Sequence, residues 1–106
     1  MDVTTVRGVE IPTVGLGTWR LTGEDCRRSV RTALELGYRH IDTAQEYGNE
    51  RQVGGALRDS DIDRRDVFLT TKLGRRNRGY DAVHRSVEES LAKLGTDYVD
   101  LLLIHW

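Results

Sequence analysis

Short apolar strand patterns alternate with amphipathic helix patterns along the 106-residue chain, and this order constrains the fold more than any other feature of the sequence. Strands are predicted at 14–18, 38–43, 67–72 and 99–104. The intervening segments carry apolar residues at helical spacing. Strands joined by helical crossovers pair in parallel, with right-handed connections. The sequence therefore predicts an α/β fold built around a parallel sheet.

The ends of three helices are predicted between these strands. The first is expected to begin at Thr22, where Asp25 completes a capping-box-like start, and to end at Gly37. The pair 54–55, two glycines, weakens the second helix by about 1 kcal/mol per glycine. The third ends at Gly95. The predicted buried stripes are Cys26, Val30, Ala33 and Leu34 in the first helix, Val53, Ala56 and Leu57 in the second, and Val83, Val87, Leu91 and Leu94 in the third.

Two parallel architectures compete for such an order, a doubly wound open sheet and a (β/α)8 TIM-type barrel. A hairpin over 3–6 and 9–11 precedes the first strand, and no linker divides the chain, so we treat it as one unit. The open sheet favours a glycine-rich phosphate turn after that strand. The segment 15–17 is only a G-x-G, so tight packing is the better interpretation.

Composition excludes several classes of function. Sixteen basic and seventeen acidic residues give a net charge of -1, which argues against binding nucleic acid or a membrane surface. One cysteine, Cys26, forbids an internal disulfide, and no Cys/His grouping has zinc-ligand spacing, so no metal is expected. The start resembles no signal peptide, and the longest aliphatic run, 101–104, is far short of a membrane span. A soluble cytoplasmic protein is predicted.

Reactive side chains follow three of the predicted strands. Asp42, Lys72 and His105 lie at carboxyl ends, and Tyr47 follows in the loop after Asp42. In a parallel barrel these ends share the face on which active sites are built. Each residue alone has a structural interpretation: a turn cap, a solvated strand end, a core histidine and a packed loop aromatic. Their coincidence on one face favours the barrel and acid–base chemistry.

The motifs around these residues resemble the aldo-keto reductase family. The similar segments are 15–19 (GLGTW), 37–44 (GYRHIDTA) with Tyr47-Gly48 and Glu50, 71–73 (TKL) and 94–106 (LGTDYVDLLLIHW). They run in consistent order and spacing from about residue 9 to the end. The resemblance implies the N-terminal part of a (β/α)8 barrel, with a short hairpin, about four parallel strands and three helices.

The resemblance also implies an NADPH-dependent reductase of aldehydes and ketones. Tyr47 is then the proton donor, Lys72 stabilises the phenolate, Asp42 pairs with Lys72, and His105 orients the carbonyl. The implied cofactor-binding residues are Gly17, Thr18, Trp19 and Asp42, and the implied substrate residues are Trp19, Tyr47, His105 and Trp106.

Three assignments near this predicted site remain open. Trp19 is either a pocket wall or a packed core residue. The arginine cluster at 75, 76 and 78 either contacts a phosphate or is a solvated loop, the second being favoured. Glu50 is expected to be a structural partner near the start of the second helix.

The length departs from the family pattern, because a (β/α)8 barrel takes about 250 residues. We therefore expect residues 1–106 to be a partial oxidoreductase domain, truncated after the fourth strand. One hypothesis is the catalytic half of a reductase acting on a small carbonyl compound. The alternative is a non-catalytic half-barrel that serves as a binding or assembly module. In either case the uncovered inner face predicts self-association.

Overall fold

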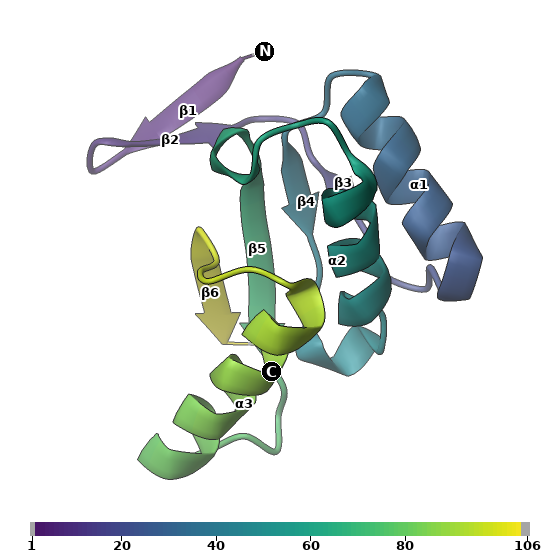
Figure 1. Cartoon of the computed structure of the whole chain (residues 1–106). Coiled ribbons are helices and arrows are strands. Elements are labelled where there is room, and N and C mark those ends of the chain that lie inside the picture. The colour runs from purple at the N-terminus through teal and green to yellow at the C-terminus, as the bar shows by residue number, and fades with distance from the viewer. Residues whose placement is uncertain (1, 105–106) are drawn as a thin grey trace.

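A four-stranded parallel sheet in the order β3-β4-β5-β6 forms the centre of the computed structural model, which describes residues 2–104 (Figure 1). The strands are β3 (Leu16–Gly17), β4 (His40–Asp42), β5 (Phe68–Leu73) and β6 (Leu101–Ile104). The helices are α1 (Gly23–Glu35), α2 (Glu50–Asp59) and α3 (Tyr80–Leu94), with single 3-10 turns η1 (Gln45–Tyr47) and η2 (Arg64–Asp66). A helix follows each of β3, β4 and β5, which confirms the predicted alternation.

The first two strands of the sheet are shorter than predicted. Only Leu16 and Gly17 of the predicted 14–18 segment pair with β4, while Val14 lies exposed in a bend. β4 begins at His40 because the residues before it complete the end of α1. β5 and the end of β6 follow the prediction closely, with β6 starting at Leu101 instead of residue 99.

The end of α1 follows the sequence prediction, but its start does not. Gly37 has φ +102° and donates to Leu34 O at 3.1 Å, while Tyr38 N donates to Ala33 O at 2.9 Å. These two backbone hydrogen bonds together form a Schellman motif. The predicted capping box is wrong: the Thr22 side chain makes no capping hydrogen bond. Asp25 instead lies 3.9 Å from an arginine one turn on, in an exposed ion pair.

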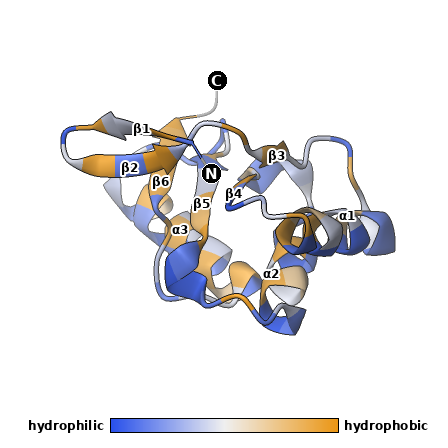
Figure 2. Cartoon of the chain, turned by 90° about the horizontal axis from the view of Figure 1, so that it is seen from above, coloured by the Kyte–Doolittle hydropathy of each residue, from blue (hydrophilic) through white to orange (hydrophobic). Residues whose placement is uncertain are grey.

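The hydrophobic core lies between the sheet and the three helices, which lie along one side of the strands (Figure 2). Its members are Cys26, Val30, Leu34, Ile41, Val53, Ala56, Val67, Leu69 and Leu94. The stripe predicted for α3 is only partly right, because Ser86 and Ser90 are buried while Val83 is not. That side of α3 meets polar groups from the β4–α2 segment. No helix in the described part of the chain is long and apolar enough to cross a membrane.

The predicted hairpin, β1 (Val3–Val6) with β2 (Val9–Pro12), pairs antiparallel and lies near the amino ends of β5 and β4 (Figure 1). His40 connects it to the sheet: Nδ1 lies 3.3 Å from Pro12 O, and Nε2 lies 3.0 Å from Thr70 Oγ1. The His40 ring also meets Phe68 edge to face. The hairpin therefore occupies the end of the sheet opposite the predicted reactive groups.

Exposed apolar side chains gather on β6, which among residues 2–104 pairs only with β5. Leu103 is 40% and Ile104 83% exposed. An unpaired strand edge with apolar side chains is a template for association. We expect the chain to associate with increasing concentration, and Leu103→Lys to weaken this. Sedimentation velocity over a hundredfold concentration range measures the degree of association of both proteins. A single monomeric wild-type species at every concentration would contradict the expectation.

Candidate active site

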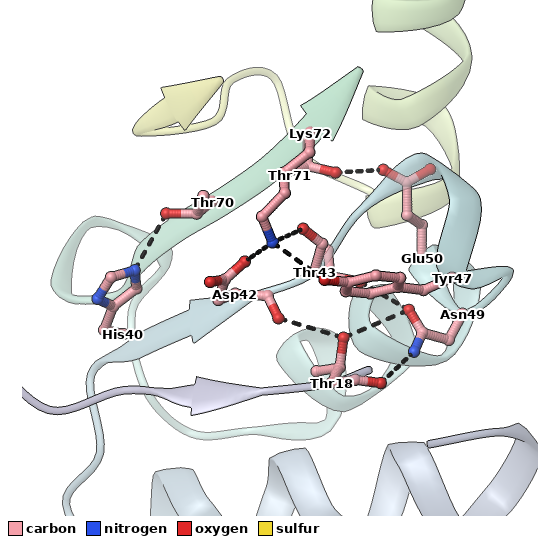
Figure 3. Close-up of polar contacts among 10 residues, drawn as sticks. All are labelled: Thr18, His40, Asp42, Thr43, Tyr47, Asn49, Glu50, Thr70, Thr71 and Lys72. Atoms are coloured by element: carbon pink, nitrogen blue, oxygen red, sulfur yellow. Dashed lines mark hydrogen bonds and ion pairs between the residues drawn. The ribbon is translucent and has the colours of Figure 1, made fainter. Parts of the chain in front are cut away.

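The Lys72 ammonium is the centre of the site (Figure 3). It projects from the carboxyl half of β5 and forms an ion pair with Asp42, the last residue of β4. Nζ also donates to Tyr47 OH and to Thr43 O, each at 3.3 Å. Because β4 and β5 are parallel neighbours, their carboxyl ends bring these groups together. The structure thus places three of the predicted catalytic residues in contact.

The environment of Lys72 keeps it charged. Burial of the ammonium lowers its pKa, but the hydrogen bonds to Asp42 and Tyr47 outweigh this, so the pKa of Lys72 is raised above its ordinary value. The cation lies 3.3 Å from the Tyr47 oxygen, where its charge offsets the negative charge that a departing proton would leave. The arrangement can therefore release a proton from Tyr47 to a neighbouring acceptor and hold the charge left behind.

This pKa shift predicts how stability depends on pH. A group whose pKa is raised by folding stabilises the protein fully below its unfolded pKa, about 10.4 for lysine, and loses that contribution as pH rises through the folded pKa. We therefore expect unfolding free energy to fall above about pH 10, and to fall less steeply in Lys72→Met. Urea unfolding between pH 8 and 11 measures both slopes. If the unfolding free energy fell equally steeply with pH in wild type and Lys72→Met, the pKa of Lys72 would not be raised by folding.

The turn η1 carries Tyr47 and is fixed from the side of α3. Gln45 Oε1 accepts hydrogen bonds from Gly74 N at 2.7 Å and Asn77 Nδ2 at 2.8 Å, and its Nε2 donates to Ser90 Oγ at 3.1 Å. Glu46 Oε1 accepts from Arg75 N at 2.8 Å. These bonds join the turn that carries Tyr47 to the loop after β5.

Glu50 behaves as the structural partner that the sequence indicates. It is 3% exposed at the start of α2, and its carboxylate accepts hydrogen bonds from Thr71 Oγ1 at 2.8 Å and Ser90 Oγ at 3.1 Å. Thr71 precedes Lys72 on β5, so this carboxylate ties the strand that carries the cation to α2 and α3. Sequence reasoning identified its role but neither of its partners.

Three of the predicted cofactor-binding residues, Gly17 at the end of β3 and Thr18 and Trp19 after it, have different environments. A Cβ added at Gly17 would meet no atom within 4 Å. Thr18 is fully buried, and its hydroxyl donates to Asp42 O at 3.2 Å. Trp19 is 65% exposed, with the Arg20 guanidinium 4.5 Å from its ring centroid. This exposure excludes the packed-core interpretation of Trp19 within the described structure.

Asn49, like Gln45, is a polar residue at the site that sequence reasoning missed. It is fully buried, and its Oδ1 accepts from Thr43 Oγ1 at 2.6 Å, while its Nδ2 donates to Thr18 O at 2.8 Å. Its position in the sequence, two residues after Tyr47 and directly before Glu50, is the signal that could have identified it as part of the site.

His105 and Trp106 lie outside the described residues, so their predicted roles stay predictions. The arginine cluster stands on the loop after β5, where Arg75 Nε is 3.5 Å from Glu46 and its side chain is 67% exposed. Among the described residues no group of His, Cys, Asp and Glu could hold a metal ion.

Comparisons with known proteins add to this geometry. The model of the aldo/keto reductase family matches residues 13–106. An aldo-keto reductase of Mycobacterium sp. (strain KMS) is 52% identical over 99 residues, which cover 93% of this chain and 36% of that protein. Methylglyoxal reductase DkgB of Escherichia coli O157:H7 is 54% identical over 96 residues, covering 91% and 36% respectively.

Solved structures agree with the sequence comparisons. An aldo/keto reductase from Brucella melitensis superposes with a TM-score of 0.96 at 48% identity, covering 99% of this chain and 40% of that one. A putative 2,5-diketo-D-gluconic acid reductase B gives 0.96 at 53% identity, covering 100% and 38%. The chain thus spans a little over a third of the length of these relatives and matches the N-terminal part of their barrels.

Proposed function

This chain belongs to the aldo/keto reductase family, and from that premise we propose that it supplies the proton-donating half of a cytoplasmic enzyme that reduces small aldehydes or ketones with NADPH. The observation that carries the proposal is the Lys72 ammonium, which contacts both the Asp42 carboxylate and the Tyr47 hydroxyl at the carboxyl end of the sheet. A buried structural lysine requires only the carboxylate as its partner, so the Tyr47 hydroxyl against the same ammonium is the feature that points to proton transfer.

Tyr47 is the proton donor in this proposal. A free tyrosine has a pKa near 10 and gives up its proton reluctantly at neutral pH. Lys72 stabilises the phenolate as the proton moves to the carbonyl oxygen, and Asp42 keeps the ammonium in place. We assign to His105 the role of orienting that carbonyl by donating a ring N–H.

The residues after β3 fit the nicotinamide end of NADPH. The space beside Gly17 is open, the Trp19 ring is exposed, and Asp42 lies next to this segment through the bond from Thr18 N to Asp42 O at 3.0 Å. Thr18 is fully buried, and its hydroxyl, N–H and carbonyl are all bonded within the protein, so it supports this segment from beneath while Gly17 and Trp19 face the cofactor. Bound NADPH supplies the hydride. We assign Trp19 and Trp106 to the walls of the substrate pocket.

The test is NADPH consumption with a reactive aromatic aldehyde, run with wild-type protein and with Tyr47→Phe. It is run on the chain alone and on the chain joined to the remaining part of one of the relatives above. We expect turnover in the completed barrel and its loss in Tyr47→Phe. Turnover that survives this substitution would overturn the assignment of the proton donor. A completed, folded barrel without any turnover would favour the non-catalytic half-barrel.

A further inference from the structure

Both polar atoms of the Asn49 side chain make hydrogen bonds, and none of their partners belongs to α2, the helix that Asn49 precedes (Figure 3). Nδ2 donates to Thr18 O at 2.8 Å and to Leu21 O at 3.0 Å. Oδ1 accepts from Thr43 Oγ1 at 2.6 Å and from Thr18 Oγ1 at 3.5 Å. The amide therefore joins the segment after β3, the end of β4 and the start of α2.

The position of Asn49 makes this pattern informative. Asn49 precedes the first residue of α2, where an asparagine ordinarily caps the helix with its side-chain oxygen. Here the side chain makes no capping hydrogen bond. Its bonding capacity is directed across to residues 18–21, a segment that is 28 to 31 positions away in the sequence.

The segment that Asn49 holds contains Trp19, and Asn49 itself stands two residues after Tyr47. Only Gly48, with φ +70°, separates them. Tyr47 is independently fixed by Lys72 and by the contacts of its neighbours in η1. Loss of the Asn49 amide would therefore loosen residues 18–21, leaving Thr18 bonded to Asp42 O, while the tyrosine stays in place.

We propose that Asn49 is a positioning residue: its buried amide holds the 18–21 segment, and with it Trp19, at a fixed distance from Tyr47. The proposal rests on the proposed function, because it assigns to this segment the task of receiving the nicotinamide end of NADPH. Asn49 acts through the backbone carbonyls of Thr18 and Leu21 and does not itself take part in proton transfer.

Asn49→Asp tests the tether in the chain as it stands. The substitution keeps an oxygen for the Thr43 and Thr18 hydroxyls but turns a carboxylate oxygen toward two carbonyl oxygens, so the segment should be released. We expect the amides of Thr18 and Leu21 to exchange with solvent at least about tenfold faster, while that of Leu69 in the core is unchanged. Thr43→Val is the matched control, because it keeps both amide N–H bonds.

If Asn49→Asp does not fold, Asn49→Ser carries the same test, since it removes the amide donor without adding charge. Equal acceleration at Thr18, Leu21 and Leu69, or no acceleration in a folded variant, would overturn the tether. NADPH titration of the completed barrel provides the second readout: we expect about tenfold weaker binding in Asn49→Asp and little change in Thr43→Val. If the Thr18 and Leu21 amides exchanged faster in Asn49→Asp but the affinity for NADPH stayed unchanged, the role of Asn49 would be purely structural. A completed wild-type barrel that folds but binds no NADPH would count against the proposed function, while amide exchange in the chain alone still decides the tether.

Discussion

Lys72→Met is expected to lower reductase turnover of the completed barrel by about a thousandfold or more, without unfolding it. Methionine fills a similar volume but carries no charge and no N–H donor. The Tyr47 phenol then loses the cation 3.3 Å from its oxygen, and the Asp42 carboxylate loses its ion-pair partner. The negative charge that forms on the Tyr47 oxygen as the proton leaves then has no neighbouring cation, so proton donation becomes slow.

The control for this experiment is Lys93→Met, because Lys93 is the other lysine of the two in the chain. It lies in the last turn of α3, where removing a cation costs about 0.3–1 kcal/mol of stability at most. We expect its turnover to stay within about twofold of wild type. Steady-state rates with an aromatic aldehyde compare the two variants. Near-normal turnover in Lys72→Met would show that the site has been assigned wrongly.

The contact between Asp42 and Lys72 could be predicted from sequence because parallel pairing alone creates it, whereas the position of Tyr47 also depends on the bonds that fix η1. Once β4 and β5 are parallel neighbours, residues at their carboxyl ends meet, whatever the details of packing. The limits of β3 could not be predicted in the same way. Val14 has the propensity of a strand residue, but Gly15 passes so close to His40 that a Cβ there would lie 2.9 Å from the ring. Pairing begins only at Leu16.

The polar contacts that hold the site were beyond sequence reasoning for a different reason. Asn49, Gln45 and Glu50 each bond to groups on other elements, and no local pattern specifies such partners. Ser90 shows the same limit: of the predicted α3 stripe only Leu94 is buried, and the other buried positions of α3 are Ser86 and Ser90, with Ser90 bonded to Gln45 and Glu50. Apolar periodicity cannot identify a helix face that is buried by hydrogen bonding.

Gly54→Ala is expected to destabilise the chain by about 2 kcal/mol, although alanine favours helices more than glycine does. A Cβ at residue 54 would lie 2.6 Å from the carbonyl oxygens of both Lys93 and Leu94, which are backbone atoms of α3. The two helices would have to move apart. In a domain of about this size, each 1 kcal/mol lowers Tm by about 4–8 °C, so thermal unfolding followed by circular dichroism resolves the change.

Gly55→Ala is the matched control and should act in the opposite direction. The atoms nearest to a Cβ there belong to the flexible Arg27 side chain, at 3.5 Å, an ordinary contact distance, so the propensity gain of up to about 1 kcal/mol is retained. Sequence alone treats the two glycines as equally weak points of α2, whereas the structure separates a required glycine from a replaceable one. If Gly54→Ala and Gly55→Ala both raised Tm, or both lowered it, this distinction would be contradicted.

The close approach at Gly54 also reaches the site. Glu50 lies four residues before Gly54 on α2, and Ser90 lies four before Leu94 on α3, so the two contacts are one helical turn apart on the same faces. Widening the helix crossing at Gly54 should therefore lengthen the 3.1 Å bond from Ser90 to Glu50. That carboxylate also holds Thr71, next to Lys72. We accordingly expect Gly54→Ala, unlike Gly55→Ala, to reduce turnover at temperatures where both variants remain folded.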